Sequence, residues 1–279
     1  MILENTINEA SKTLKHHNIE SHNLDAQILL AEIMGVSREF LISRSKTYLT
    51  KEVRQKYYNA IKRRIKNEPI AYITGKREFW SHDFLVNSFT LVPRPETELL
   101  IYKIVNYFKN KSINILDIGT GSGCILLSIL KELKNARGVG IDVSSKTIKI
   151  AKLNSKNLDL TNRSKFIVSD INKFNSGKYG LIVSNPPYIP YRDIRNLSKD
   201  IINYEPWVAL NGGNDGLDLI KKVIYKSSRL LKKSGLFAIE IGNKQYTKVS
   251  NILNRFRFRE IGKEYDNNKN VRCIITTKL

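Results

Sequence analysis

The second half of the chain alternates short apolar runs with longer helical stretches, and this alternation restricts the fold more than any other feature. The apolar runs predict strands at residues 113–116, 138–141, 166–168, 181–183 and 236–240. Helical spacing predicts three helices: one that follows residue 123 and continues to Leu133, one over 148–158 and one over 217–231. Such alternation is typical of a mostly parallel sheet with helices on both faces. Two further runs, 258–264 and 271–276, indicate an antiparallel hairpin at one edge and complete a seven-stranded sheet.

The first part of the chain shows helical spacing and no strand pattern. It predicts a small bundle in which Gly35 ends the second helix, while Ser37 and Thr50 cap the third and fourth. The helical period breaks at Glu68-Pro69, and a β-hairpin is expected shortly afterwards. The expected domains are residues 1–67 for substrate recognition, 68–95 as a linker with the hairpin, and 96–279 as the α/β domain.

The composition fits a chain that folds around its own core. Hydrophobic residues make up 41% of the 279 residues, which is ordinary for a globular protein. No apolar run reaches the roughly 18 residues of a membrane span, and residues 1–5 lack the pattern of a signal peptide. Cys124 and Cys273 are far apart and lack metal-ligand spacing. We therefore expect a cytoplasmic protein without disulfides, metal sites or membrane contact.

The net charge of +21 raises the question of a nucleic-acid partner, because a basic surface attracts phosphate. The 47 Lys and Arg residues, against 26 Asp and Glu, are spread along the whole chain and do not gather in one segment. The charge is compatible with RNA, with an acidic protein partner or with no partner, so it decides little by itself.

A glycine-rich loop, residues 119–123, separates a predicted strand from the next helix. Glycines there let the backbone turn tightly and approach a ligand. The loop lacks the Lys-Ser/Thr ending of a phosphate-binding P-loop, and its GxGxG spacing differs from the GxGxxG of dinucleotide-binding proteins. Asp142, at the end of the next strand, could accept hydrogen bonds from two ribose hydroxyls. Asp170, at the end of the third strand, could accept one from an adenine amino group.

Each of these acids, taken alone, is better explained as a cap on the helix that follows it. Together with the glycine loop, at the ends of three successive strands, they favour an adenosine ligand. S-adenosylmethionine fits because it needs neither a triphosphate cradle nor a hydride partner. An NAD-dependent oxidoreductase remains an alternative.

The seven residues 184–190, Ser-Asn-Pro-Pro-Tyr-Ile-Pro, follow the fourth predicted strand, where a parallel sheet places its ligands. The side-chain oxygen of Asn185 and the carbonyl of Pro186 can each accept one hydrogen of an amino group, and neither proline offers a competing N–H. Tyr188 adds a flat aromatic face. The motif therefore indicates a site for a planar –NH2 group, with a plain proline-rich turn or a polyproline docking segment as the alternative.

These motifs together resemble the HemK/PrmC family of protein-(glutamine-N5) methyltransferases, which act on class 1 peptide chain release factors. The resemblance rests on motifs in one order: residues 94–98 (Arg-Pro-Glu-Thr-Glu), 117–123, 184–190, 204–206 (Tyr-Glu-Pro) and 209–217. It covers almost the whole chain. It implies a class I S-adenosylmethionine-dependent methyltransferase fold, Rossmann-like, with a small N-terminal helical bundle.

The resemblance also implies a role for individual residues. The cofactor S-adenosyl-L-methionine would be bound by Asp117, Gly119, Thr120, Gly121, Ser122, Gly123, Asp142, Asp170, Ile171 and Asn185. The substrate glutamine would be bound by Asn185, Pro186, Pro187 and Tyr188, and the catalytic residues would be Asn185, Pro186 and Tyr188. Ile171 departs from the family, in which an aromatic residue is common, so aliphatic packing would replace stacking on the adenine.

The expected reaction is in-line methyl transfer to the glutamine amide nitrogen of a Gly-Gly-Gln motif, by a monomeric enzyme without metal, covalent intermediate or stable nucleic-acid binding. The leading alternative is a DNA or RNA adenine-N6 methyltransferase, since the exocyclic amine of adenine could be held by the same two acceptors. Such an enzyme would have to flip the target base out of the helix. A non-enzymatic binding module is a further alternative. Phe79, Trp80 and Arg94 are candidate partner contacts, and residues 211–216 form either a flap or a plain turn.

Overall fold

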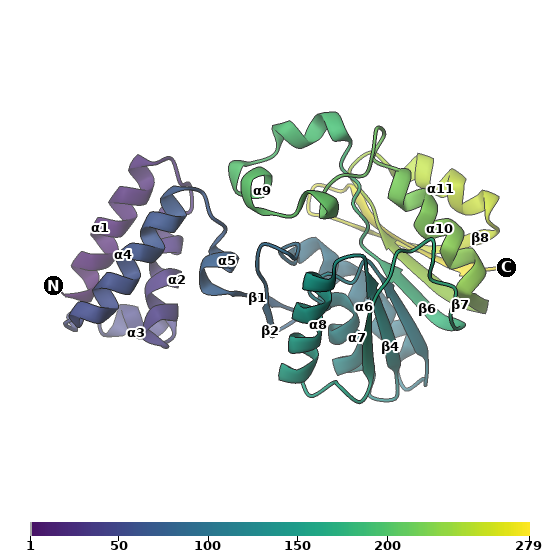
Figure 1. The fold of residues 1–279 in the computed structure, drawn as a ribbon, viewed down its shortest axis with the longest axis horizontal. Coiled ribbons are helices and arrows are strands. Elements are labelled where there is room, and N and C mark those ends of the chain that lie inside the picture. Colours follow the sequence, from purple (N-terminus) through teal and green to yellow (C-terminus); the bar gives the residue numbers. More distant parts are fainter. Residues whose placement is uncertain (1) are drawn as a thin grey trace. The chain divides into compact units, whose positions relative to one another are not determined.

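The computed structural model describes residues 2–279, so only Met1 of the expected helical domain lies outside the described residues. The chain divides into two compact units (Figure 1). The helical unit comprises the residues up to Lys76 together with Ser198–Tyr204, and the sheet unit comprises Arg77–Leu197 and Glu205–Leu279. A short segment therefore leaves the sheet unit, joins the helical unit and returns.

The helical unit contains short helices whose ends follow from local chemistry. They are α1 (Leu3–His16), α2 (His22–Met34), α3 (Arg38–Ser43), α4 (Lys51–Ile65), α5 (Ile70–Thr74) and α9 (Lys199–Tyr204). The hydroxyls of Ser37 and Thr50 each accept a backbone N–H at 3.3 Å, from Phe40 and Val53. Gly35 adopts a left-handed φ of 66° after α2, which glycine tolerates best. The expected caps and stop are confirmed.

The core of the helical unit includes one buried hydrogen bond and one ion pair. The Tyr57 hydroxyl, fully buried, donates to the Ala26 carbonyl at 3.0 Å. Arg64 Nε lies 2.7 Å from Asp25 Oδ2, with both side chains largely buried. Ile70 and Ile73 of α5 pack against the same core, so helical structure continues into the range 68–95 that we expected to be a linker. Five residues between Pro69 and Gly75 are too few to show a helical period.

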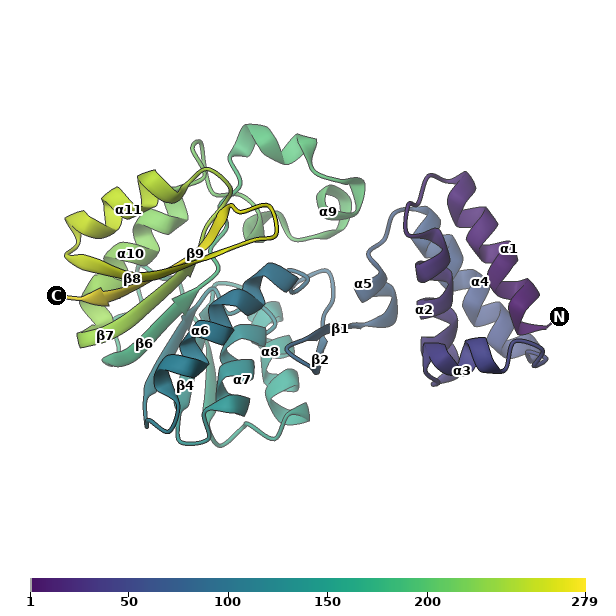
Figure 2. The ribbon, with the colours of Figure 1, turned by 180° about the vertical axis from the view of Figure 1, so that it is seen from behind.

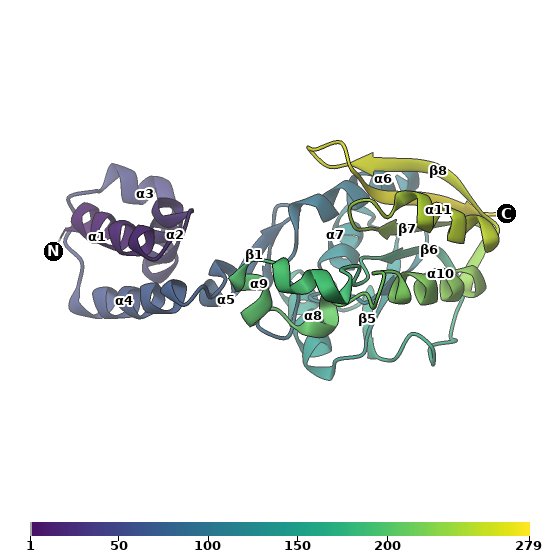
Figure 3. The ribbon, with the colours of Figure 1, turned by 90° about the horizontal axis from the view of Figure 1, so that it is seen from above.

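The sheet unit is built on a seven-stranded sheet with the order β5-β4-β3-β6-β7-β9-β8. The strands are β3 (Asn114–Ile118), β4 (Arg137–Asp142), β5 (Ser164–Val168), β6 (Tyr179–Ser184), β7 (Leu231–Glu240), β8 (Phe258–Tyr265) and β9 (Val271–Lys278). Only β9 runs antiparallel to its neighbours β7 and β8 within the described sheet. The hairpin β8–β9 forms one edge (Figure 3). The predicted α/β fold with an antiparallel edge hairpin is confirmed.

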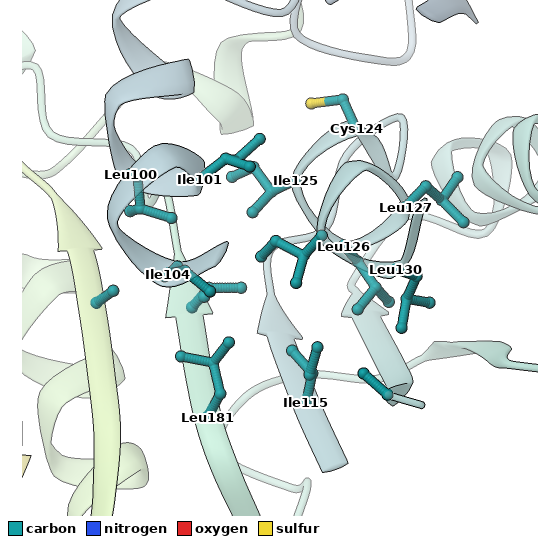
Figure 4. Packing of buried hydrophobic residues seen from close by; sticks show 14 of the residues in the cluster. Leu100, Ile101, Ile104, Ile115, Cys124, Ile125, Leu126, Leu127, Leu130 and Leu181 are labelled. Atoms are coloured by element: carbon teal, nitrogen blue, oxygen red, sulfur yellow. The ribbon is translucent and has the colours of Figure 1, made fainter. Parts of the chain in front are cut away.

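Helices cover both faces of this sheet because its side chains alternate between two apolar cores. The first core holds Ile115 and Leu181 with residues of α6 (Glu98–Phe108), α7 (Cys124–Glu132) and α8 (Ser145–Asn157). The second holds Leu116 and Ile182 with residues of α10 (Asp218–Leu230) and α11 (Tyr246–Arg255). Figure 2 shows the two helix groups on either side of the strands. In Figure 4 the side chains of α6 and α7 point onto Ile115 and Leu181.

The predicted hairpin is present as β1 (Lys76–Phe79) and β2 (His82–Leu85). Trp80 and Ser81 form its two-residue turn with φ values of 50° and 57°, as a type I′ turn requires. Phe79 is fully buried in the first core of the sheet unit, so its proposed role as a partner contact is wrong. Trp80 donates its indole N–H to Glu132 at 2.8 Å.

One buried amide ties this hairpin to the glycine loop. Asn154 of α8 accepts from the Leu85 N–H at 2.7 Å and donates to the carbonyls of Leu85 and Ser122 at 3.0 and 2.9 Å. Its side chain is fully buried, so water does not compete for these bonds.

We expect Asn154→Ala to lower the free energy of unfolding by roughly 2–4 kcal/mol, because it leaves buried backbone groups without partners. Urea denaturation measures this directly. Asn157→Ala, at an exposed position of the same helix, is the matched control and is expected to change the value by less than about 0.5 kcal/mol. Equal effects in the two variants would show that the buried bonds contribute nothing.

Candidate active site

The sheet unit contains a cavity of about 310 Å³ at the carboxyl ends of its central parallel strands. The ends of β3, β4 and β6 contribute Ile118, Gly119 and Gly121, then residues 141–143 and 184–187. Ser169 and Ile171 follow β5, and residues 89–91 and 206–209 complete much of the wall. Parallel strands place their carboxyl ends at one edge, which is where open α/β sheets bind ligands. The size matches small-molecule sites.

The glycine loop opens this cavity because two of its residues lack side chains. Gly119 and Gly121 have φ values of 75° and 57°, and a Cβ on either would meet no other atom within 4 Å. Both line the cavity. Gly123 has another role, since a Cβ there would lie 3.1 Å from Leu127 and 3.2 Å from Phe166. It allows the first turn of α7 to pack closely on the sheet.

Asp142 lies on the cavity wall and holds the glycine loop in place. Its Oδ2 accepts the Gly121 N–H at 3.2 Å and its Oδ1 accepts the Ser144 N–H at 3.0 Å. The helix cap is Ser144, whose hydroxyl accepts the Thr147 N–H at 3.2 Å. Burial raises the pKa of the Asp142 carboxyl. Each carboxylate oxygen still has a lone pair for a ligand hydroxyl.

The structure places the other two acids of the predicted cofactor site away from the wall. Asp117 is fully buried, and its Oδ2 accepts the Thr120 hydroxyl proton at 2.7 Å. Burial raises the pKa of Asp117 to about 7. Asp170 is exposed and its Oδ1 accepts the Asn172 N–H at 2.7 Å. Ile171, beside Asp170, is buried and does line the cavity.

The residues after β6 bring the amide-binding motif to the same cavity. The Ser184 hydroxyl donates to the Ile118 carbonyl at 2.7 Å and thereby joins the ends of β6 and β3. Asn185, Pro186 and Pro187 line the wall. Asn185 donates from Nδ2 to the Thr97 hydroxyl at 3.2 Å, which leaves Oδ1 as an acceptor for a ligand.

Tyr188 lies beside the cavity rather than on the described wall. Its hydroxyl accepts from Arg272 at 2.9 Å, and the Arg272 guanidinium carbon lies 5.4 Å from its ring centroid. Burial, together with the charge of Glu240, raises its pKa to about 12. The role of Tyr188 as a stacking surface for the substrate stays a prediction.

Of the predicted site residues, seven line the cavity together: Gly119, Gly121, Asp142, Ile171, Asn185, Pro186 and Pro187. The other predicted residues lie beside or beneath it: Asp117, Thr120, Ser122, Gly123, Asp170 and Tyr188. Thr120 and Ser122 are buried, so they support the loop from behind.

Sequence reasoning missed the wall that residues 206–209 form. The signal was present in the Tyr204-Glu205-Pro206 motif, to which no role was assigned. Glu205 is buried; it accepts the Val92 N–H and forms an ion pair with Arg94. This pair holds the segment that follows Glu205 at the cavity and explains Arg94 without a partner protein.

The residues present fit S-adenosylmethionine. The two open glycine positions leave room for a ligand beside the backbone, and the Asp142 carboxylate can accept from ribose hydroxyls. Ile141, Ile171 and Val223 make part of the wall apolar, which suits a flat base. Gly119, Gly121, Asp142 and Ile171 would therefore hold the cofactor, with Asn185 beside it.

Comparisons with known proteins agree with this arrangement. A family model described as the PrmC N-terminal domain matches residues 5–75, and one described as a methyltransferase domain matches residues 109–277. A methyltransferase structure from Pyrococcus furiosus superposes with a TM-score of 0.54 at 17% identity, over 79% of this chain and 98% of that one. It shows the fold. The chain is a methyltransferase with a mostly parallel, Rossmann-like sheet.

Two relatives identify the family of methyltransferases to which the chain belongs. The release factor glutamine methyltransferase of Buchnera aphidicola subsp. Schizaphis graminum is 40% identical, over 90% of this chain and 90% of the relative. That of Clostridium acetobutylicum is 37% identical, over 94% and 93%. The chain belongs to the family of release factor glutamine methyltransferases.

The two acids at the strand ends give opposite expectations for cofactor binding. We expect Asp142→Ala to weaken binding of S-adenosylhomocysteine about 10- to 100-fold, because hydrogen bonds to a charged group are lost. Asp170→Ala, which removes an exposed carboxylate outside the wall, is expected to change the affinity by less than about twofold. Calorimetric titration measures both. A larger loss of affinity in Asp170→Ala would support the adenine contact that the sequence predicted for this residue.

The raised pKa of Asp117 predicts a pH dependence of stability. Its folded-state pKa of about 7 lies above the ordinary value of 3.8, so its contribution is fully present below the ordinary pKa and is lost as the pH rises through 7. Between pH 5 and pH 8 the wild type should lose about 2–3 kcal/mol more than Asp117→Asn. Urea denaturation without cofactor tests this, and parallel curves for the two proteins would contradict it.

Proposed function

We propose that this chain transfers a methyl group from S-adenosylmethionine to the side-chain amide nitrogen, N5, of the glutamine in the Gly-Gly-Gln motif of class 1 peptide chain release factors. The observation that supports it best is the anchoring of Asn185: its Nδ2 is engaged by Thr97, so its Oδ1 is left as an acceptor on the wall of the cofactor cavity. The names of its relatives agree with this substrate.

The substrate amide is a weak nucleophile, so the site acts by positioning. S-adenosylmethionine supplies an electrophilic methyl group on a sulfonium. Asn185 Oδ1 and the Pro186 carbonyl accept the two amide hydrogens and orient the nitrogen towards that methyl. The two acceptors interact more strongly as the nitrogen becomes cationic, which is where catalysis requires it. After transfer the nitrogen releases one proton to water and becomes a neutral N-methyl amide.

A rigid mounting makes these acceptors effective. Pro186 and Pro187 fix two successive φ angles, and the Ser184 hydroxyl anchors the preceding residue to β3. Good orientation of reacting groups can supply about 7–11 kcal/mol of barrier reduction, so no strong general base is required.

An adenine-N6 methyltransferase of DNA or RNA is the second candidate, because an exocyclic amine offers the same two hydrogens. The high positive charge is the observation in its favour, but the basic residues are distributed over the whole chain. We propose that the enzyme acts as a monomer in the cytoplasm, where release factors work, without stable nucleic-acid binding. No helix among residues 2–279 is long and apolar enough to cross a membrane.

Methyl transfer from labelled S-adenosylmethionine to a purified release factor tests the function. The factor is used with its Gly-Gly-Gln glutamine intact or changed to alanine, beside DNA and RNA samples. Label on the intact factor alone supports the proposal. If nucleic acid is labelled and neither release factor is, the proposed substrate is wrong. The site would then still bind an amino group, that of a nucleic-acid base.

Within this assay we expect Asn185→Ala to lower kcat by about 10²–10³-fold, the usual cost of losing one preorganised hydrogen-bonding group. Binding of S-adenosylhomocysteine is expected to change less than about threefold, because the glycine loop and Asp142 are untouched. Asn251→Ala, exposed on α11, is the control. Unchanged turnover in Asn185→Ala would remove that residue from the mechanism.

A further inference from the structure

A chain of hydrogen bonds runs from Asn185 into the interior of the sheet unit. Asn185 Nδ2 donates to Thr97 Oγ1 at 3.2 Å, and Thr97 Oγ1 donates to Glu240 Oε2 at 2.6 Å. Glu240 Oε1 lies 3.6 Å from the Arg272 guanidinium and 3.4 Å from the Tyr188 hydroxyl. The side chains of Thr97 and Glu240 are almost wholly buried, so water does not compete for these bonds.

The number of protons on each group determines which group donates and which accepts along this series of hydrogen bonds. Arg272 can only donate, and an ionised carboxylate can only accept. The Thr97 hydroxyl has a single proton and gives it to Glu240, so towards Asn185 it can only accept. Asn185 must then present its NH2 to Thr97, which leaves its carbonyl oxygen facing the cavity.

Protonation of Glu240 would reverse this direction. A neutral Glu240 can donate to Thr97 Oγ1, and Thr97 would then give its own proton to Asn185. The Asn185 amide would turn and present an NH2 group to the cavity, where a substrate amino group needs an acceptor. The state of Glu240 therefore decides whether Asn185 accepts or donates.

Several titratable groups face Glu240. Arg272 and the Cys273 thiol come from β9, the Tyr188 hydroxyl from the residues after β6, Glu96 from the turn before α6, and the Cys124 thiol from the start of α7. Burial raises the pKa of Glu240, while the hydrogen bond from Thr97 and the charge of Arg272 act to lower it. Arg272 is the cation in direct reach, and it favours the ionised form.

We infer that Thr97 and Glu240 are positioning residues, which fix the Asn185 amide with its carbonyl oxygen towards the substrate. Neither residue is among those that line the cavity, so both act through the residues they contact, chiefly Asn185. The inference rests on the proposed function, in which that oxygen accepts a hydrogen of the substrate amide.

Four variants test the inference in the release-factor methylation assay. Thr97→Val removes the acceptor with little change of shape, and Thr97→Ser keeps the hydroxyl. In Glu240→Gln the amide oxygen should face Arg272, so the NH2 faces Thr97 and imposes the reversed direction. Thr276→Val is the matched control, because Thr276 is an equally buried threonine whose hydroxyl donates to the Phe237 carbonyl at 3.1 Å, outside this chain of bonds.

We expect Thr97→Val and Glu240→Gln each to lower kcat about tenfold, with KM for the release factor and the Kd of S-adenosylhomocysteine within twofold of wild type. Thr97→Ser should keep kcat within about threefold. The double variant Thr97→Val/Glu240→Gln should lose no more than Thr97→Val alone, since one path is broken in both. In the wild type kcat should fall as acid protonates Glu240, and this acidic limb should be absent in Glu240→Gln.

A structural role would give a different pattern. Thr276→Val reports the cost of losing a buried hydroxyl, and thermal unfolding of all variants shows whether they remain folded. Equal kcat in Thr97→Val and Thr276→Val, or an unchanged acidic limb in Glu240→Gln, would overturn the inference. If Asn185→Ala retains full turnover, the proposed function of the site fails first. If Asn185→Ala is inactive while Thr97→Val is fully active, the proposed function stands and only the positioning role of Thr97 and Glu240 is wrong.

Discussion

The parallel pairing of β3 with β4 on one side and β6 on the other is the constraint on which the site depends. In this register Ile118 lies opposite both Ile141 and Ser184, so three segments distant in the chain end at one level. The Ser184 hydroxyl donates to the Ile118 carbonyl and so holds the ends of β6 and β3 side by side. A slip by one residue would move each side chain of β3 into the opposite core, where it does not fit the packing, and would shift Asn185 relative to the glycine loop.

The parts of the fold that could be predicted were those determined by neighbouring residues. Ser37 and Thr50 cap their helices through groups three positions away, and the apolar runs of the strands identify a buried parallel sheet without any long-range information. Helix α5 was missed because five residues carry too little periodicity. The glycine loop and the motif at Asn185 were found because each is continuous in the sequence.

What could not be predicted depends on partners far apart in the chain. Thr97 and Glu240 are 143 positions apart, and Arg94 and Glu205 are 111 apart. Thr97 and Glu240 looked like an ordinary helix start and strand end, Arg94 was taken as a candidate partner contact, and Glu205 was assigned no role. Asp142 was ambiguous for the same reason, since a cap and a ligand contact look alike until Ser144 is seen to supply the cap. Asp170 followed a strand as Asp142 does, yet the chain turns there and leaves its carboxylate exposed.

The buried acids behind the cavity use the low dielectric of the interior in two ways. The groups that favour the ionised form of Asp117, the Thr120 hydroxyl and the Leu126 N–H, are neutral, so burial dominates and its pKa rises to about 7. Glu240 meets a cation and two hydroxyl groups, so its ionised form has partners even though it is fully buried. A buried charge with directional partners orients them strongly, because water does not compete with those partners in the interior. Under the proposed function, the protons on Arg272, Glu240 and Thr97 therefore determine which atom of the neutral Asn185 amide faces the substrate.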